Sequence, residues 1–386
     1  MGDNINKTLE EHEIYLREMI NEGLRTAGFS INDRGGIEDE DFNKEKIRNL
    51  HKPKREEIVN KNMAFVNDKA KKIMPYFANG SEIDATRIAP EIIEVKPRSL
   101  EGDIFRFASL LWSVPVSQGF GRRMRFLVKD ASNGKLIGIF ALGDPVFNLA
   151  ARDKWIGWST EDRLSRLVSV MDAYTVGAVP PYSSLICGKL IASLMGSKEV
   201  IETYKRKYYN RITIIKKVLL KKDLALITTT SSMGRSSIYN RLVVPNGPKL
   251  IKIGNTKGYG HFHLSGEIFY EMKEYLKRLS HPYVNGNRYG NGPNWRMRII
   301  RTVLSKLGYN PDCLLKHGIE REVYAMPLGN NWKEYLLGKD TEIEKNSLSA
   351  AEISEFCLNR WVIPRSERND AYKYINNVSI LKTIVS

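Results

Sequence analysis

The stretch MRFLVKDASNGKLIGIFAL, residues 124–142, predicts two β-strands joined by a tight turn. Its two apolar runs, 124–129 and 135–142, flank the pair Asn133-Gly134. Asn-Gly between two such runs favours the left-handed backbone of a short hairpin turn. We therefore expect an antiparallel hairpin here, and we expect it to begin a sheet.

Further strands and helices are predicted after this hairpin. Residues 173–179 and 224–229 predict strands, an apolar helix is predicted at 185–195, and 250–253 predicts another strand. The order of these elements resembles that of the acetyltransferase-like (GNAT-like) core. We therefore expect an α/β (α+β) fold with a GNAT-like central mixed sheet. A helical N-terminal region and a small C-terminal α/β extension are expected around it.

The loop after the strand at 173–179 bears on the cofactor. In the GNAT-like core, backbone N–H groups of this loop and of the next helix hold the pyrophosphate of acyl-coenzyme A. The matching loop here is VPPYSSLICG (179–188), with Ser183 or Ser184 as a helix N-cap. It lacks the Arg/Gln-x-x-Gly-x-Gly/Ala pattern of those enzymes, so the cofactor stays unknown.

Local patterns outside this core give further expectations. Apolar residues recur at helical spacing within 9–24, 54–78 and 100–112, which predicts helices. Residues 155–158 predict a short strand, and the chain after Pro364 predicts a polar tail.

The chain of 386 residues is long enough for two or three domains. We expect a helical N-terminal region over 1–120, with 81–96 as a connection, and the α/β core over 121–280. A basic extension over 281–340 and a C-terminal helix with its tail over 341–386 would complete the chain.

Positive charge is concentrated in one part of the chain. The formal net charge is +16, and the stretch from Tyr204 to Pro311 holds 21 Lys or Arg against 4 acidic residues. Tyr and Trp are interleaved with these cations, and cations bind phosphates while rings stack on bases. The pattern favours nucleic-acid binding, although a solvated basic domain or a contact surface for acidic proteins has the same composition. The residues expected to contact phosphate are Lys205, Arg206, Lys207, Arg211, Arg235, Arg296, Arg298 and Arg301.

Two polar segments and the loop described above offer candidate catalytic groups. GDPVFNLAARDKWIGWS (143–159) combines acids, an arginine and two tryptophans, which could act as base, anion clamp and stacking rings. TTTSSMGRSSIYNR (228–241) is rich in hydroxyls, and its tyrosine, Tyr239, offers a general acid or a stacking ring. The candidate catalytic residues are Asp144, Arg152, Asp153, Ser184 and Tyr239. Turns, ion pairs, helix caps and sheet packing would use the same residue types, so a structural role stays open.

Several classes of protein are disfavoured by composition. No apolar run reaches the roughly 18 residues that a membrane-spanning helix needs. The N-terminus is polar and acidic, unlike a secretory signal, and the three cysteines lack metal-site spacing. His261 and His263 alternate as on a strand but have no nearby third ligand. We expect a cytoplasmic protein without a metal site.

Five stretches of this chain together resemble the DruA family. They are GRRMRFLVKD (121–130), GDPVFNLAARDKWIGWS (143–159), SSIYNRL (236–242), IGNTKGYG (253–260) and LLKHGIEREVYAMPLGNNWKEYLLG (314–338). The resemblance implies a bacterial, cytoplasmic component of the Druantia type I anti-phage defence system. It also implies partner subunits, among them a large helicase-like protein, but it implies no particular reaction.

The sequence therefore supports three hypotheses about the function. The first is a nucleic-acid-binding component of an antiviral complex, carried by the basic stretch. The second is a GNAT-like transferase that modifies a nucleobase or a small molecule. The third is a basic scaffold subunit for acidic partner proteins.

Overall fold

The computed structural model describes residues 8–26, 28–30, 37, 43–116, 121–212, 219–264, 266–285, 295–344 and 346–385. It divides into two compact units. Unit 1 comprises residues 1–54 and 256–321, and unit 2 comprises 55–255 and 322–386. The four-part division expected from the sequence has other boundaries and stays a prediction.

Unit 1 is helical over its described residues. Its helices are α1 (Leu9–Thr26), the start of α2 (Lys44–Ile73), α8 (Glu267–Arg278), α9 (Trp295–Lys306) and α10 (Pro311–Leu315). Helix α1 packs against α8, α8 packs against α9, and α9 packs against α10. The buried face of α1 consists of Leu16, Ile20 and Leu24, all with no exposed surface. Their spacing confirms the helix predicted for this region.

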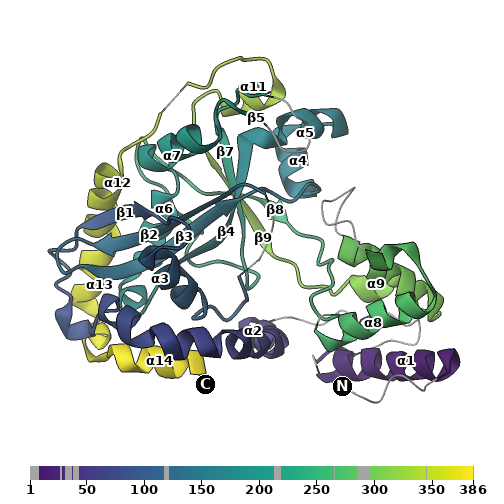
Figure 1. Ribbon diagram of the computed structural model, residues 1–386. Helices are drawn as coiled ribbons and strands as arrows, with labels where there is room; N and C mark the ends of the chain where they lie inside the picture. The colour runs from purple at the N-terminus through teal and green to yellow at the C-terminus, as the bar shows by residue number, and fades with distance from the viewer. Residues whose placement is uncertain are drawn as a thin grey trace. The chain divides into compact units, whose positions relative to one another are not determined.

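Unit 2 is built around a seven-stranded mixed sheet (Figure 1). Its strands are β1 (Pro90–Glu94), β2 (Arg123–Asp130), β3 (Lys135–Gly143), β4 (Val170–Ala178), β7 (Leu226–Thr230), β8 (Ile251–Asn255) and β9 (Glu322–Pro327). Their order in the sheet is β1-β2-β3-β4-β7-β9-β8. Strands β4 and β7 pair in parallel, whereas the other neighbours pair antiparallel. Strands β5 (Arg211–Ile212) and β6 (Leu219–Leu220) form a separate two-stranded sheet.

Helices cover both faces of this sheet (Figure 1). They are α3 (Leu100–Ser109), α4 (Ala150–Ile156), α5 (Thr160–Arg166), α6 (Cys187–Leu194), α7 (Lys198–Tyr208), α11 (Trp332–Leu337), α12 (Ala350–Cys357), α13 (Ile363–Arg368) and α14 (Asn377–Val385). One apolar core joins the sheet to α6, α7 and α12. A second joins β2 and β3 to α2, α3 and α14, and a third includes α4 and α11. The mixed α/β class expected from the sequence is confirmed.

The hairpin predicted at 124–142 is confirmed as β2 and β3. Asp130 pairs with Lys135 at the turn, and Gly134 has the left-handed φ of 73° that the turn requires. The Asn133 Oδ1 atom accepts a hydrogen bond of 2.9 Å from the Lys135 backbone N–H. Asp130 is fully buried, and its Oδ1 accepts bonds of 3.0 Å from the backbone of Ala89 and of Ser132. The turn is therefore held by its own side chains.

Three local predictions are wrong. Residues 155–158 are not a strand, because helix α4 runs to Ile156 and Gly157 ends it with a left-handed φ of 91°. The segment 81–96 contains the edge strand β1, which starts at Pro90, a position where a strand tolerates proline. The chain after Pro364 is not merely a polar tail, since α14 buries Ile380 and Ile384.

Candidate functional site

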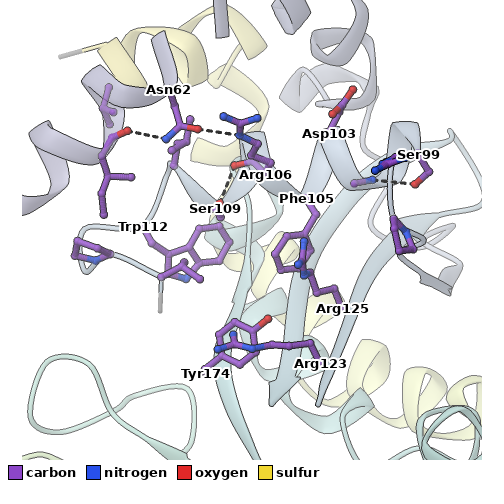
Figure 2. A pocket seen from close by; sticks show the side chains of 18 of the residues that line it. Asn62, Ser99, Asp103, Phe105, Arg106, Ser109, Trp112, Arg123, Arg125 and Tyr174 are labelled. Carbon is purple, nitrogen blue, oxygen red and sulfur yellow. Dashed lines mark hydrogen bonds between the residues drawn. The ribbon is translucent and has the colours of Figure 1, made fainter. Parts of the chain in front are cut away.

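Unit 2 contains a pocket of about 480 Å³ at the start of β2 (Figure 2). Residues of α2, of the β1–α3 connection, of α3 and of β2 line it, and Tyr174 from β4 joins them. Protein sites for small ligands commonly measure about 300–1,000 Å³. The pocket is therefore large enough for a ligand of ordinary metabolite size.

Among the described residues, six basic side chains line the pocket, against one acidic side chain. The cations are Arg55, Lys96, Arg98, Arg106, Arg123 and Arg125, and Asp103 is the carboxylate among the lining residues. Within the described part of the chain, Arg98, Arg106 and Arg125 form no salt bridge with a carboxylate. Their charge is not neutralised by close acidic neighbours, so the pocket attracts anions.

Strand alternation explains two of these cations. Side chains alternate between the two faces of a strand, so Arg123 and Arg125 share one face of β2. Met124 and Phe126 point to the other face and are buried in the core with α6 and α12. Burial of the apolar set therefore directs both arginines toward the pocket.

The remaining wall comes from α2 and α3. The Ser99 hydroxyl oxygen accepts a hydrogen bond of 3.2 Å from the Gly102 N–H and so caps α3. One turn further, Arg106 donates from Nε to Asn62 Oδ1 of α2 at 2.8 Å. Its guanidinium also lies 4.0 Å from the centre of the Phe65 ring. Figure 2 shows the Asn62–Arg106 hydrogen bond and the hydrogen bond at Ser99 as dashed lines.

Three aromatic rings also line the pocket: Phe105, Trp112 and Tyr174 (Figure 2). Tyr174 is the extra residue of a β-bulge, since Ala141 pairs with Thr175 and Leu142 pairs with Ala173. The Arg123 guanidinium lies 4.0 Å from the centre of the Tyr174 ring. The pocket thus combines positive charge with rings that can stack on a ligand.

Gly143 permits the close approach of Arg123 and Tyr174. A Cβ atom at this position would lie 3.2 Å from the Tyr174 ring and 3.5 Å from the Arg123 Nε atom. Gly143 pairs with Arg123 on one side and with Asp172 of β4 on the other. The missing side chain leaves room for the Tyr174 ring and the Arg123 guanidinium above Gly143.

Asp172 lies in register with Arg123 of this wall, because both residues pair with Gly143. Its Oδ1 accepts a hydrogen bond of 2.8 Å from the Thr228 hydroxyl of β7. Burial raises the pKa of Asp172 to about 6, although Thr228 and the charges of Arg152 and Arg123 oppose the rise. The carboxyl group therefore titrates close to neutral pH, as a group that exchanges protons would.

The two parallel strands separate beside Asp172. Strands β4 and β7 pair at Val170–Leu226, Met171–Ile227 and Asp172–Thr228, and the ladder ends there. Beyond it, the Thr229 hydroxyl donates to the Ala173 carbonyl at 2.9 Å. Ligands of α/β sheets bind where neighbouring parallel strands part at their carboxyl ends. The sheet topology therefore leads to the same region as the charges do.

Arg152 and Asp153, both predicted as catalytic, form a buried network. Arg152 has no exposed surface and donates to Asp153 Oδ1 at 2.8 and 2.7 Å. It also donates to the carbonyls of Val146 and Phe147 at 2.9 Å. Arg163 completes the network by donating to Asp153 Oδ2 at 2.7 Å. Every one of these contacts braces the protein itself, which favours a structural role.

The other predicted catalytic residues lie apart from this network. Asp144 pairs with Arg122, Nε to Oδ1, at 2.6 Å. Ser184 lies in the turn before α6, where its carbonyl accepts from Arg365 at 3.2 Å. Tyr239 is buried, packs on the Tyr324 ring and has its pKa raised to about 12 by burial. The structure does not bring the five predicted residues together.

The loop at 179–188 does not fit the pyrophosphate of acyl-coenzyme A. Pro180 and Pro181 have no N–H group. The N–H groups of Ser183, Ser184 and Ile186 donate to carbonyls within the loop at 2.9, 3.0 and 3.3 Å. A cradle for phosphate needs such donors to be available. The cofactor therefore stays unknown.

The predicted phosphate contacts are divided between the two units. In unit 2, Arg206 and Lys207 both pair with Glu94, Lys205 lies 3.8 Å from Asp223, and Arg211 and Arg235 are exposed. In unit 1, Arg301 binds Asp312 through two bonds of 2.6 and 3.1 Å, and Arg296 lies over the Phe269 ring. Arg298 lies on the same helix, α9. Several of these cations are thus neutralised by carboxylates.

The histidines of unit 1 form an aromatic cluster. His261 and His263 lie in a turn and not on a strand, so that prediction is wrong. Phe262 contacts His51, His263 and His317 at ring-centre distances of 4.8, 5.3 and 5.0 Å. Burial lowers the pKa of His51 and His263 to about 4. Over the described residues, no three His, Cys, Asp or Glu side chains are placed to hold a metal ion.

No sequence motif marks the pocket, because its lining residues are dispersed along the chain. Four of its cations precede residue 120, in a region without a recognisable motif. A usable signal was present in the run Arg122-Arg123-Met124-Arg125, where strand alternation aligns two arginines. Asp172 was detectable as a lone acid inside the apolar stretch 170–179.

The fold and the site define an α/β protein of two units. Its pocket is lined by basic side chains and aromatic rings, and the short parallel ladder of β4 and β7 ends in the same region of the sheet. The chain belongs to the DruA family, because the family model described as "Druantia protein DruA" matches residues 41–338. It is 45% identical over 362 residues to the Druantia protein DruA of Escherichia coli strain UMEA 4076-1. That match covers 94% of this chain and 89% of the relative. No solved structure matches the chain.

A first prediction concerns Arg152. Replacement by Ala leaves Asp153 Oδ1 and two backbone carbonyls without the Arg152 donor, although Arg163 still binds Oδ2, so we expect the free energy of unfolding to fall by about 3–5 kcal/mol. Urea unfolding followed by tryptophan fluorescence measures this change. Lys154→Ala is the control, since Lys154 is exposed on the same helix and should shift stability by less than about 0.5 kcal/mol. Unchanged stability of Arg152→Ala would contradict the structural role.

A second prediction concerns the titration of Asp172. The folded state binds this proton more tightly than the unfolded state, so stability should decrease as the pH rises from about 4 to about 6. Asp172→Asn removes that contribution and should flatten the curve of unfolding free energy against pH. Asp68→Asn serves as control because Asp68 is exposed. Equal slopes in the Asp172→Asn variant and the unmodified protein would refute the assignment.

Proposed function

We propose that this chain is a nucleic-acid-binding component of the Druantia anti-phage defence system. Membership of the DruA family supports the role in Druantia. The observation that carries nucleic-acid binding is the pocket, in which six cations surround aromatic rings and a single carboxylate, Asp103, stands among the lining residues (Figure 2). Phosphate binds cations and bases stack on rings, so one ligand class uses both features.

The distribution of charge supports the same proposal. Unit 2 holds 40 Lys or Arg against 27 Asp or Glu, so most of the net charge of +16 belongs to the unit that contains the pocket. Charge of one sign on the walls of a hollow raises the local concentration of the opposite ion. A polyanion is therefore drawn toward the pocket before any specific contact forms. The other Druantia subunits, including a helicase-like protein, are the proposed partners, and the cytoplasm is the proposed location.

No described helix is long and apolar enough to cross a membrane.

A second candidate function is transfer of a group within a GNAT-like core. The observation that favours it is the short parallel pairing of β4 and β7, which ends at Asp172. The order of elements expected from the sequence supports a GNAT-like sheet. Asp172, with its pKa raised to about 6, is the group best suited to accept a proton at such a site. The acyl-coenzyme A loop is absent, so the donor of this transfer would be another compound.

The third prediction tests nucleic-acid binding. We expect the purified protein to be retained on DNA at low salt, with log affinity falling as log salt rises. The double variant Arg98→Glu/Arg125→Glu changes two exposed pocket cations and should reduce that slope by about 2. Arg206→Glu/Lys207→Glu is the matched control, because both side chains lie outside the pocket and are paired with Glu94, so the slope should change less.

Two outcomes would count against this proposal. Failure of the unmodified protein to bind DNA at low salt excludes direct binding by the isolated chain. Salt-sensitive association with acidic partner proteins under those conditions would favour the scaffold hypothesis instead.

The fourth prediction separates transfer chemistry from binding alone. In cells that carry the complete defence system, Asp172→Asn should abolish protection against phage if Asp172 accepts a proton during a reaction. The same variant should retain DNA binding in vitro, because it removes no pocket cation. Tyr239→Phe tests the predicted tyrosine in parallel. Full protection by both variants would exclude a reaction that depends on these groups.

A further inference from the structure

The three aromatic rings of the pocket set it apart from a simple phosphate site. Trp112 is half-buried, and its indole packs so closely on β4 that a Cβ atom at Gly177 would lie 2.8 Å from it. Figure 2 shows Trp112, Phe105 and the Arg123–Tyr174 pair around the same hollow. An inorganic anion needs the arginines alone, so the rings indicate a ligand that also has a flat apolar face.

The cations lie beside these rings. Arg123 and Arg125 are two residues apart on one face of β2, a spacing of roughly 7 Å along the strand. The Arg125 guanidinium lies 5.8 Å from the centre of the Phe105 ring. The planar guanidinium group of arginine can donate two hydrogen bonds to the oxygen atoms of one phosphate. A ligand that places phosphate on these arginines can therefore reach the rings with an attached flat group.

The shape of the pocket limits how large that ligand can be. Its walls come from α2, α3 and β2, and its volume is about 480 Å³. In a duplex the flat faces of the bases are covered by their neighbours, so they are not accessible to a protein ring. A base becomes available for stacking when it is unpaired, at a strand end or in a single strand.

The amide and aliphatic hydroxyl side chains of the pocket, those of Asn62, Ser99 and Ser109, are already bonded to the protein. The Asn62 amide donates to the Ile58 carbonyl and accepts from Arg106, at 2.7 and 2.8 Å. Ser99 and Ser109 donate their hydroxyl protons to backbone carbonyls at 2.9 and 2.7 Å. Few groups remain to read the edge of a base. Recognition through stacking and phosphate alone is tolerant of base identity.

We propose that this pocket holds one unstacked nucleotide, with its phosphate on Arg123 and Arg125 and its base against Trp112, and with little preference among bases. The inference rests on the proposed nucleic-acid function and names the part of a nucleic acid that the pocket takes. The nucleotide is either free or an unpaired residue of a strand. Both sources present the same chemistry.

The test uses the full chain and isothermal titration with AMP, CMP, GMP, UMP and inorganic phosphate. The four nucleotides should bind with affinities within about tenfold of one another. Inorganic phosphate should bind at least ten times more weakly than AMP. An oligo-dT single strand should displace AMP, and a blunt duplex of equal length should not. AMP binding no tighter than phosphate, or equal displacement by the duplex, would overturn the inference.

Variants test separately which residue contacts the base and which contacts the phosphate. Trp112→Leu keeps an apolar but smaller side chain and removes the ring, so it should weaken AMP binding at least tenfold and leave phosphate binding unchanged. Trp112→Phe should retain AMP binding, which controls for folding. Arg125→Ala should weaken both ligands, and Trp361→Leu, a tryptophan outside the pocket, should change neither. Unchanged AMP affinity in Trp112→Leu refutes the stacking role.

This experiment also separates the inference from the proposed function. DNA retention without AMP binding overturns the nucleotide pocket and leaves nucleic-acid binding through another surface intact. Absence of both removes the two together.

Discussion

Three residue pairs of parallel sheet join the two halves of unit 2. Strands β1 to β4 form one antiparallel half and β7, β9 and β8 form the other, and only the β4–β7 ladder connects them within the sheet. The ladder ends at the Asp172–Thr228 pair, and the Thr229 hydroxyl then binds the Ala173 carbonyl in place of a further rung. Asp172, whose pKa is raised by burial, lies at this last rung, and Gly143 pairs with both Asp172 and Arg123, so the two are in register across β3. The short ladder therefore ends at a buried acid that shares its register with one cation of the pocket.

Apolar packing determines where the positive charges gather. Helix α3 buries Ile104, Phe107 and Ala108 against the sheet, so Arg106 must face outward. Strand β2 buries Met124 and Phe126, which directs Arg125 to the opposite face. Cations from separate elements therefore meet at one hollow because each element buries its apolar side first. The mutual repulsion of these cations raises the energy of the pocket, and a bound anion would reduce that repulsion.

Buried charge and available charge have different roles in this molecule. Arg152 binds Asp153 and two carbonyls with no exposed surface, so its charge is fully used within the fold. Arg125 is exposed and lines the pocket, so its charge is available to a ligand. The segment 143–159 has the composition of a catalytic site, yet its central ion pair braces the chain. Composition alone does not distinguish these roles, because both need the same residue types.

Local patterns in the sequence were sufficient for the β2–β3 hairpin, the face of α1 and the helices between the central strands, since neighbouring residues determine turns and amphipathic faces. They also identified the DruA family. They did not find β1 or the insertion of β9 between β7 and β8, which depend on pairing with distant strands. Local patterns could not predict the pocket either, for the same reason. Its cations extend from Arg55 to Arg125 and its Tyr174 belongs to a later strand, so only the tertiary structure brings them to one hollow.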